Sequence, residues 1–501
     1  MTAVTQNTVA PTRSRRWTAQ ILSLPVLLGC ALVCLLFLVT SRGGINPLAD
    51  PDIWWHLRNA QELVSTGHFV HHDAWTFTVA GRPWINFEWL AELPFYFAYE
   101  RLGLQGLYLT MMAVASAIVL GIYSLAWLRS GDWNAAFLAT FVGIYFAEVS
   151  LGPRTLLFGW LFLTIEVAIL WNLRRGRDWT YALPPLFLVW INTHGSWFLG
   201  FGLMVVFFAC GLVEGEWGGL YAVRWTAAQR RRWLIVIAAS AVALFANPYG
   251  WRLVAYPLDA IVHQKLGVQY IAEWASLDFH GQRGKIVLGV LLLFGILQLV
   301  RRRRWALEDL AFTLLAIYSA VTYSRLLFLA GILLMPLLAI DLKGLVMTPY
   351  EPGRNRPVLN AVATAILVAV VALACPSTRA LHAGIAQEFP EAALPYVRSL
   401  AGQGHVFNEY HWGGYFEWQA PLVEEFIDPR ADVFVQNGVM QDYVKAIGGT
   451  DTFAILDRYQ IRYAILMQGG SAAYLLGHSA QWKRTYADPL AVVFERVQPG
   501  R

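Results

Sequence analysis

A series of long apolar runs, separated by short and often basic segments, is the feature that most restricts how this chain can fold. About eleven runs approach the roughly 20 residues that a helix needs to cross a bilayer. They centre on 18–41, 104–128, 134–149, 155–173, 180–193, 196–214, 232–247, 285–300, 305–322, 325–341 and 357–375. Only 14% of the 501 residues are charged, whereas soluble domains carry about a quarter. The sequence therefore predicts a polytopic α-helical membrane protein.

The basic residues between the runs predict how the helices are oriented. We take the first run as a retained signal anchor, because it is longer than a signal-peptide core and follows a polar segment that ends in arginines. With the N-terminus in the cytoplasm, every tight basic cluster falls on the inner side. These clusters are Arg129; Arg174, Arg175 and Arg177; Arg224 and Arg230 to Arg232; Arg301 to Arg304; and Lys343, Arg354 and Arg356. We expect a multi-pass protein of the inner (plasma) membrane whose C-terminal end lies outside, and no nucleic-acid partner.

Composition divides the chain into regions. Residues 1–375 form the predicted transmembrane domain, in which 42–103 is a large first outer loop. Residues 376–501 have an ordinary globular composition and predict an extracytoplasmic α/β domain. Its β-like runs are His405–Phe407, Glu425–Asp428, Tyr463–Met467 and Ala491–Glu495, and its helical stretches are 390–401 and 437–447. The four cysteines lie in or beside apolar runs without metal-ligand spacing, so we expect no disulfide framework.

The chemically unusual residues gather on the predicted outer face, whereas the inner loops hold basic clusters and little else. The first outer loop opens with Asp50-Pro51-Asp52 and continues into a stretch, 52–66, whose apolar positions predict a helix lying along the membrane surface. The candidate functional side chains of the outer face are Asp50, Asp52, His56, Arg58, Glu88, Arg154, His194 and Arg325. Their joint position on one face favours a common site.

Each of these residues also has a structural interpretation. One of the two aspartates could cap the helix at 52–66, because Asp accepts hydrogen bonds from the free N–H groups of a first turn. Glu88 could equally mark the start of a helix. Arg154 and His194 stand at the ends of apolar runs, where snorkelling arginines and hydrogen-bonded histidines are common.

Taken together, this arrangement resembles the GT-C superfamily of integral-membrane glycosyltransferases. The resemblance is to protein O-mannosyltransferases, the aminoarabinose transferase of lipid A and oligosaccharyltransferase catalytic subunits. Those proteins have a cytoplasmic N-terminus, about eleven to thirteen spans and an acidic motif just after the first span, which Asp50-Pro51-Asp52 matches here. The tail departs from oligosaccharyltransferases, because it has no Trp-Trp-Asp-Tyr-Gly signature; Tyr410–Tyr415 is its nearest aromatic cluster.

The resemblance implies transfer of a sugar from a polyprenyl-phosphate-linked donor to an extracytoplasmic glycan, lipid or protein. The residues allow this chemistry. Asp50 or Asp52 would be the general base that takes the proton of the acceptor hydroxyl, and cationic side chains would stabilise the leaving phosphate at the bilayer edge. The candidates for the phosphate are Arg58, Arg154, His194 and Arg325, and His56 and Glu88 complete the predicted substrate-binding set.

Two further expectations concern cofactors and rival functions. The resemblance implies that a divalent metal, Mg²⁺ or Mn²⁺, could bind Asp50 and Asp52, although no residue pattern requires a cofactor. The alternative function is a transporter or flippase, or an assembly factor, for lipid-linked envelope saccharides. A transporter would be favoured by paired inverted halves with interrupted helices, and the sequence contains no such repeat.

Overall fold

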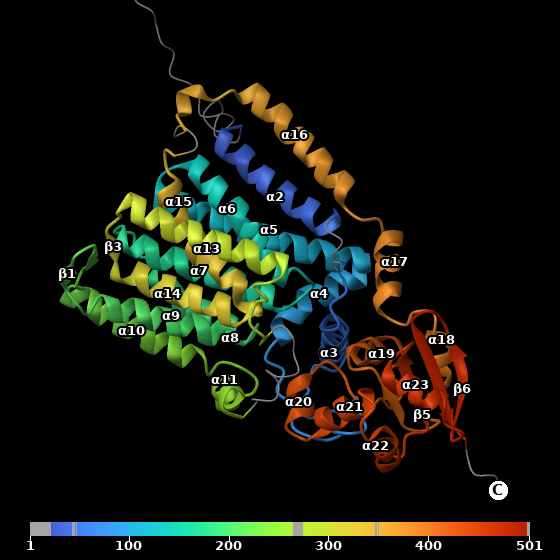
Figure 1. Cartoon of the computed structure of the whole chain (residues 1–501). Coiled ribbons are helices and arrows are strands. Elements are labelled where there is room, and N and C mark those ends of the chain that lie inside the picture. Colours follow the sequence, from blue (N-terminus) through green and yellow to red (C-terminus); the bar gives the residue numbers. More distant parts are fainter. Residues whose placement is uncertain are drawn as a thin grey trace, which may run out of the picture.

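The computed structural model describes residues 22–42, 46, 48–263, 274–345, 348 and 350–497. The N-terminal segment with Arg13, Arg15 and Arg16 lies outside this part. The described chain is mostly helical, with a small sheet near its C-terminal end (Figure 1). The helices of the bundle are α2 (Leu24–Arg42), α5 (Leu104–Ser130), α6 (Trp133–Ala147), α7 (Leu156–Arg174), α8 (Leu183–Ile191), α9 (Trp197–Cys210), α10 (Ala227–Ala243), α11 (Trp251–His263), α13 (Gln282–Arg301), α14 (Leu307–Thr322), α15 (Leu327–Leu342) and α16 (Pro357–Ala374).

Every predicted apolar run coincides with one of these helices. Within the described residues, six helical segments are long and apolar enough to cross a membrane: Leu24–Ser41, Leu104–Ser130, Leu156–Arg174, Gln282–Arg301, Ser324–Leu342 and Pro357–Ala374. Three further apolar helical segments are shorter: Trp133–Ala147, Thr180–Ile191 and Trp197–Cys210. The chain is therefore a multi-pass membrane protein, while the count of about eleven spans stays a prediction.

Burial separates the centre of the bundle from its rim. Helix α15 is apolar all round, and every side chain from Leu327 to Ala339 is buried, as expected for a helix enclosed by others. It packs against α5, α6 and α14. Helix α16 is equally apolar but exposed, with Leu373 84% accessible, and it lies beside α2 at the edge of the bundle (Figure 1). Such a surface suits contact with lipid.

One end of the bundle collects the predicted inner basic clusters. Arg129 pairs with Asp309, and Arg174 Nε lies 2.7 Å from Glu308 Oε1. A small sheet closes the same end, with strands β1 (Gly215–Trp217), β2 (Leu220–Ala222) and β3 (Trp305–Ala306) in that order. These contacts bring loops that are distant in sequence to one end of the bundle, while the side of the membrane that this end faces stays a prediction.

The first outer loop supplies two helices, α3 (Asp52–Thr66) and α4 (Trp89–Leu102). Helix α3 coincides with the predicted surface helix. Its apolar residues recur at helical spacing and are buried, whereas its last turn is exposed. It ends at Gly67, whose φ of 71° is readily adopted only by a residue without a Cβ. Helix α4 begins directly after Glu88, so both helix starts carry predicted site residues.

The C-terminal region contains a four-stranded sheet of order β4-β5-β7-β6, in which β4 and β5 are parallel and the other neighbours antiparallel. Its elements are α17 (Thr378–Glu388), α18 (Leu394–Ser399), β4 (Val406–Asn408), α19 (Gly413–Gln419), α20 (Ala431–Val435), α21 (Val439–Ile447), α22 (Thr452–Arg458), β5 (Tyr463–Met467), α23 (Ser471–Gly477), β6 (Trp482–Ala487) and β7 (Ala491–Arg496). The domain boundary at 375/376 stays a prediction.

Two details of the predicted sheet are wrong. Strand β6 was not predicted, and Glu425–Asp428 is not a strand. The Asn408 side chain accepts hydrogen bonds from the N–H groups of Phe426 and Ile427 and donates to the Ile427 carbonyl. Because a side chain takes these backbone groups, only isolated bridges to Thr76 and Val406 form at Glu425.

The C-terminal region packs directly on α3. Helix α19 lies between α3 and the sheet (Figure 1). A Cβ at Gly414 would stand 3.1 Å from the Pro51 carbonyl oxygen, so the two backbones approach each other closely here and glycine fits best. The Trp54 ring meets Tyr415 edge to face at a centroid distance of 5.0 Å. The start of α3, with its two aspartates, is therefore held against the tail.

Candidate functional site

The two aspartates at the start of α3 make different contacts. Asp50 Oδ1 accepts the Asp52 backbone N–H at 2.9 Å, and Asp50 Oδ2 accepts from Arg154 Nε. Among the described residues, the Asp52 side chain accepts one long hydrogen bond, from Trp55 Nε1 at 3.4 Å. Capping of the helix by Asp52 is therefore wrong, because Pro51 occupies the cap position and Asp50 makes the helix-start contact.

Asp52 lies in a buried and charged environment. Burial is the main cause that raises its pKa to about 6, and the Asp50 charge adds to the rise. Arg154, His56 and Arg325 act in the opposite direction. Asp52 is therefore a carboxylate that is mostly ionised at neutral pH yet basic enough to accept a proton.

Glu88 lies between two imidazoles. Its Oε2 is 3.6 Å from His56 Nε2, and its Oε1 is 3.2 Å from His194 Nε2. Burial is the main cause that raises the pKa of Glu88 to about 7, against the lowering effect of His56 and of a hydrogen bond from Thr155. Glu88 stands at the N-cap position of α4, but its side chain caps no N–H there. Glu88 does mark the start of a helix, as one interpretation predicted, but its side chain contacts the two histidines and not the helix.

The two histidines differ in protonation. Burial, together with the charges of Arg325 and His56, lowers the pKa of His194 to about 3. Its Nδ1 accepts the Ser196 backbone N–H at 2.9 Å, so that Nε2 carries the proton and donates toward Glu88. For His56, burial opposes the charged form, but the hydrogen bond to Glu92 and the nearby carboxylates raise its pKa. One imidazole is therefore neutral, and the other favours the cation.

Glu92 supports this group from beneath, and the sequence analysis missed it. Its carboxylate receives His56 Nδ1 at 2.9 Å, Asn59 Nδ2 at 2.5 Å and Asn86 Nδ2 at 3.0 Å. A sequence signal was available, because His56 and Asn59 are three residues apart on α3, and Glu88 and Glu92 are separated by four at the start of α4. Such spacings place side chains on one face of a helix.

The arginines complete the group, with one exception. Arg154 precedes α7, and Arg325 lies in the short helix η4 (Ser324–Leu326), from where its charge acts on Asp52 and His194. Arg58 instead donates to Gln61 at 3.0 Å on the partly exposed side of α3. It is two positions after His56, and residues two apart on a helix do not share a face. Apart from Arg58, the predicted residues form one group, which we call the Asp52 cluster: Asp50, Asp52, His56, Glu88, Arg154, His194 and Arg325.

The tail borders this cluster through Tyr410. Burial, followed by the charge of Asp52, raises the pKa of Tyr410 well above its ordinary value. The phenol donates to the Pro429 carbonyl at 2.8 Å, and the Tyr410 backbone N–H donates to the Tyr443 hydroxyl at 3.0 Å. Residues from the two ends of the sequence thus share one buried region.

The contacts of the two aspartates do not favour a metal at this position. Both Asp50 oxygens are engaged, one by the Arg154 guanidinium and the other by a backbone N–H. The remaining nearby charges that compensate Asp52 come from His56 and Arg325. We therefore assign no catalytic step to a metal here, and the expectation of Mg²⁺ or Mn²⁺ at Asp50 and Asp52 stays a prediction.

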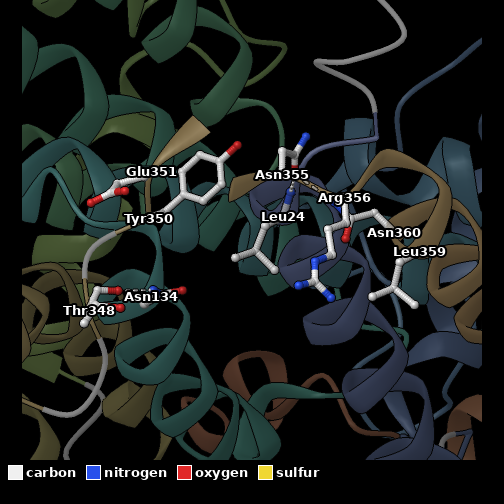
Figure 2. Close-up of a pocket in the computed structure, with 9 residues that line it drawn as sticks. All are labelled: Leu24, Asn134, Thr348, Tyr350, Glu351, Asn355, Arg356, Leu359 and Asn360. Carbon is white, nitrogen blue, oxygen red and sulfur yellow. Dashed lines mark hydrogen bonds between the residues drawn. The ribbon is translucent and has the colours of Figure 1, made fainter. Parts of the chain in front are cut away.

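A cavity of about 250 Å³ lies elsewhere, at the junction of α2, α6 and α16. Figure 2 shows its lining residues, which include Asn134, Glu351, Asn355 and Arg356. Asn355 Oδ1 accepts the Leu24 backbone N–H at 3.0 Å, so that this polar group joins α2 to the segment before α16. We interpret the cavity as part of that junction, because its wall lacks the histidines and paired carboxylates of the Asp52 cluster.

Comparison with known proteins yields matches in structure alone. No protein-family model and no curated sequence matches the chain. The oligosaccharyltransferase of Archaeoglobus fulgidus in its apo form matches with a TM-score of 0.55 at 14% identity, over 88% of this chain and 69% of that one. ArnT from Cupriavidus metallidurans, bound to undecaprenyl phosphate, matches with a TM-score of 0.52 at 14% identity, over 95% of this chain and 98% of that one.

A third solved structure agrees. It is the archaeal oligosaccharyltransferase AglB from Archaeoglobus fulgidus with an inhibitory peptide and a dolichol-phosphate, with a TM-score of 0.54 at 12% identity, over 91% of this chain and 70% of that one. The chain has a GT-C fold. The resemblance seen in the helix layout and in Asp50-Pro51-Asp52 is thereby confirmed for the fold. At these identities the GT-C fold by itself assigns neither substrate nor residue roles.

Proposed function

We propose that this protein is a glycosyltransferase that moves a sugar from a polyprenyl-phosphate-linked donor to an extracytoplasmic acceptor. The observation that carries the proposal is Asp52, a partly buried carboxylate with one long hydrogen bond, close to two arginines and in the loop that follows the first apolar helix. Two GT-C neighbours hold a dolichol-phosphate and an undecaprenyl phosphate. This supports a lipid-phosphate carrier as the donor class.

Asp52 is the proposed general base. Asp50 is less suited, because Arg154 and a backbone N–H already bind its two oxygens. Asp52 would take the proton of the acceptor hydroxyl as that oxygen attacks the anomeric carbon of the donor. The bond between the anomeric carbon and the phosphate oxygen breaks, and the phosphate leaves with the electron pair. The products are the glycosylated acceptor and the polyprenyl phosphate.

The leaving phosphate gains negative charge, which Arg154 and Arg325 would stabilise. Both residues stand at ends of apolar helices that are predicted to face outward. A lipid-linked phosphate would lie there, and arginine presents a planar fork of donors to phosphate oxygens. Arg154 contacts Asp50, so donor binding would have to share or replace that ion pair. Glu88 and Glu92 position the histidines and have no proposed contact with the reacting atoms.

The decisive experiment compares Asp52→Asn with Glu100→Gln in purified full-length protein. Glu100 is an exposed carboxylate on α4 and serves as the matched control. Turnover of a panel of polyprenyl-phosphate sugars, with envelope lipids and glycans as acceptors, is followed by release of the polyprenyl phosphate. We expect Asp52→Asn to lower turnover about 10²–10⁴-fold, the usual contribution of a general base, and Glu100→Gln to retain it.

Full turnover by Asp52→Asn would refute the proposed base. A wild-type protein that binds several donors saturably but transfers none of their sugars would instead favour the alternative, a transporter or flippase. Asp50→Asn should keep more activity than Asp52→Asn, since Asp50 acts on the reaction through Arg154 and through the Asp52 carboxylate.

A further inference from the structure

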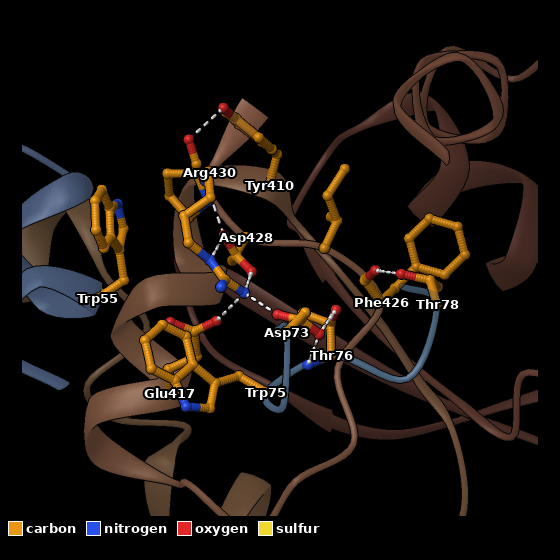
Figure 3. A network of polar contacts seen from close by, with 12 residues as sticks. Trp55, Asp73, Trp75, Thr76, Thr78, Tyr410, Glu417, Phe426, Asp428 and Arg430 are labelled. Carbon is orange, nitrogen blue, oxygen red and sulfur yellow. Dashed lines mark hydrogen bonds and ion pairs between the residues drawn. The ribbon is translucent and has the colours of Figure 1, made fainter. Parts of the chain in front are cut away.

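A second group of charged residues lies between the first outer loop and the tail, and the proposed transfer reaction does not use it. We call it the Glu417 cluster: Asp73, Glu417, Glu425, Asp428 and Arg430. None of these residues is more than 4% exposed. Figure 3 shows Asp73 reaching Arg430 from the loop segment, while Glu417 and Asp428 approach the same guanidinium from the tail.

Arg430 satisfies two of the four carboxylates. Its Nη2 lies 2.5 Å from Asp73 Oδ1 and 2.6 Å from Asp428 Oδ2, and its Nε donates to Asp428 Oδ1 at 2.9 Å. The guanidinium is enclosed by the rings of Trp75 and Trp84, at 4.4 and 4.6 Å. The other Asp73 oxygen accepts from Thr76. These contacts explain Asp73, Asp428 and Arg430 as a built ion-pair group.

They leave two carboxylates unexplained. All four side-chain oxygens of Glu417 and Glu425 are buried, and none accepts a hydrogen bond from an N–H or hydroxyl donor among the described residues. Their hydrogen-bonding neighbours are other carboxyl groups, Asp428 for Glu417 and Glu417 for Glu425. The nearest cationic atom is Arg430 Nη2, which is 3.5 Å from Glu417 Oε1. Buried polar atoms are almost always paired, and an unpaired buried carboxylate is especially costly. These oxygens point to a missing positive partner.

The charges support this conclusion. Four carboxylates surround one guanidinium, so the ionised group has a net charge of −3, from four negative charges and one positive charge. Single oxygens of Glu417, Glu425 and Asp428 all lie within 4.8 Å of one another. Two ligands at about 2.4 Å on opposite sides of a Ca²⁺ ion are about 4.8 Å apart, so these oxygens are close enough together to bind one cation.

We propose that Glu417 and Glu425, with Asp428 sharing an oxygen that Arg430 already binds, form a binding site for a divalent, oxygen-preferring cation of the Ca²⁺ class. The donor set is carboxylate only, which disfavours zinc and other metals that prefer nitrogen or sulfur. Ca²⁺ accepts irregular oxygen ligands, whereas Mg²⁺ demands a near-octahedral sphere and usually retains several waters. A buried set of carboxylates without regular geometry therefore suits the former ion.

The bound cation would tie the first outer loop to the tail. The Phe77 N–H donates to the Glu425 carbonyl at 3.2 Å, and Thr78 Oγ1 donates to the Phe426 carbonyl at 2.6 Å. Glu417 is carried by α19, the helix that packs on α3. Neutralising the two glutamates would stabilise this contact without placing the ion in the reaction.

Protons are the competing explanation and define the pH dependence. In the metal-free state, burial and then the neighbouring carboxylates raise the pKa of Glu417 and Glu425 well above the ordinary value. A carboxylate must be deprotonated to bind a cation, so protons and the cation compete for these oxygens. Cation affinity should rise with pH, with release of protons on binding.

The test uses full-length protein in detergent, freed of metal with EDTA. Terbium, which replaces Ca²⁺ on carboxylates, is excited through tryptophan, and Trp75 and Trp84 lie beside Arg430. We expect one saturable Tb³⁺ signal per chain, displaced by Ca²⁺ at lower concentration than by Mg²⁺. Glu425→Gln should weaken Tb³⁺ binding at least about tenfold, whereas Glu424→Gln, an exposed neighbour, should leave it unchanged.

Calcium-dependent thermal unfolding of the wild-type protein provides a measurement that needs no variant. Ca²⁺ should raise Tm, and the increase should be larger at pH 8 than at pH 6. A Tb³⁺ signal that Glu425→Gln retains would overturn the proposal. A wild-type Tm that changes with pH but not with Ca²⁺ would overturn it as well, since the glutamates would then be satisfied by protons alone.

Discussion

The Asp52 cluster and the Glu417 cluster are both buried groups of carboxylates around arginine, but their charges are compensated in different ways. At Asp52, the compensating charges come from separate elements, namely the segment before α7, η4 and α3. In the Glu417 cluster, one guanidinium that contacts the rings of two tryptophans binds two carboxylates at close range. The first arrangement leaves a carboxylate available for a substrate, and the second holds two segments of the chain together.

The comparison shows why burial alone does not identify a catalytic carboxylate. Asp52, which is partly buried, and Glu425, which is buried, both have a raised pKa. They differ in their surroundings. Near Asp52, arginines at the ends of apolar helices could bind the phosphate of a donor, whereas the one arginine near Glu425 already binds two other carboxylates. The following predictions test this difference, beginning with the largest expected effect.

Arg430→Ala should destabilise the protein more than any other single change considered. It leaves the Asp73 and Asp428 carboxylates buried without their cation, and breaking such a buried pair costs about 3–5 kcal/mol. Thermal or denaturant unfolding in detergent measures the loss. Arg462→Ala, on an exposed pair with Glu495, is the control and should cost at most about 1 kcal/mol. Equal losses for the two variants would mean that the Glu417 cluster is no structural tie.

The transfer rate should depend on pH through Asp52. A general base works when deprotonated, so activity should rise as pH increases through about 6 and fall about tenfold per pH unit well below that value. The Asp50 charge contributes to the raised pKa of Asp52, and its loss also leaves the Arg154 charge uncompensated. Asp50→Asn should therefore shift the midpoint to lower pH. An unchanged pH–rate profile in Asp50→Asn would argue against Asp52 as the base.

Arg58→Gln is expected to have the smallest effect. The sequence places Arg58 among the phosphate candidates, but its guanidinium donates to Gln61 on the partly exposed side of α3. Transfer should stay within about twofold of the wild-type rate, because a partly exposed side chain away from the cluster contributes little. The matched comparison is Arg325→Gln, which should lower the rate clearly. A large loss in Arg58→Gln would extend the donor site beyond the Asp52 cluster.

Much of this molecule could be predicted from local sequence properties. Length and hydropathy identified the apolar helices, and the spacing of apolar residues identified α3, because both properties are read within a few turns of one helix. The positions of the basic clusters implied which chain segments share an end of the bundle. This orientation was enough to predict that the residues of the Asp52 cluster lie at the same end of the bundle, but not which of them are in contact.

Only the tertiary structure decided which partner each side chain has. In the structure Arg154 binds Asp50, Arg58 donates to Gln61 outside the Asp52 cluster, and His56 forms a hydrogen bond with Glu92. It also joined Asp73 to Arg430, which are 357 positions apart. Hydropathy and helical period act over neighbouring residues, whereas such pairings depend on how distant segments pack. A sequence therefore determines where apolar helices form, while the protonation and availability of each buried acid depend on the charges that packing brings beside it.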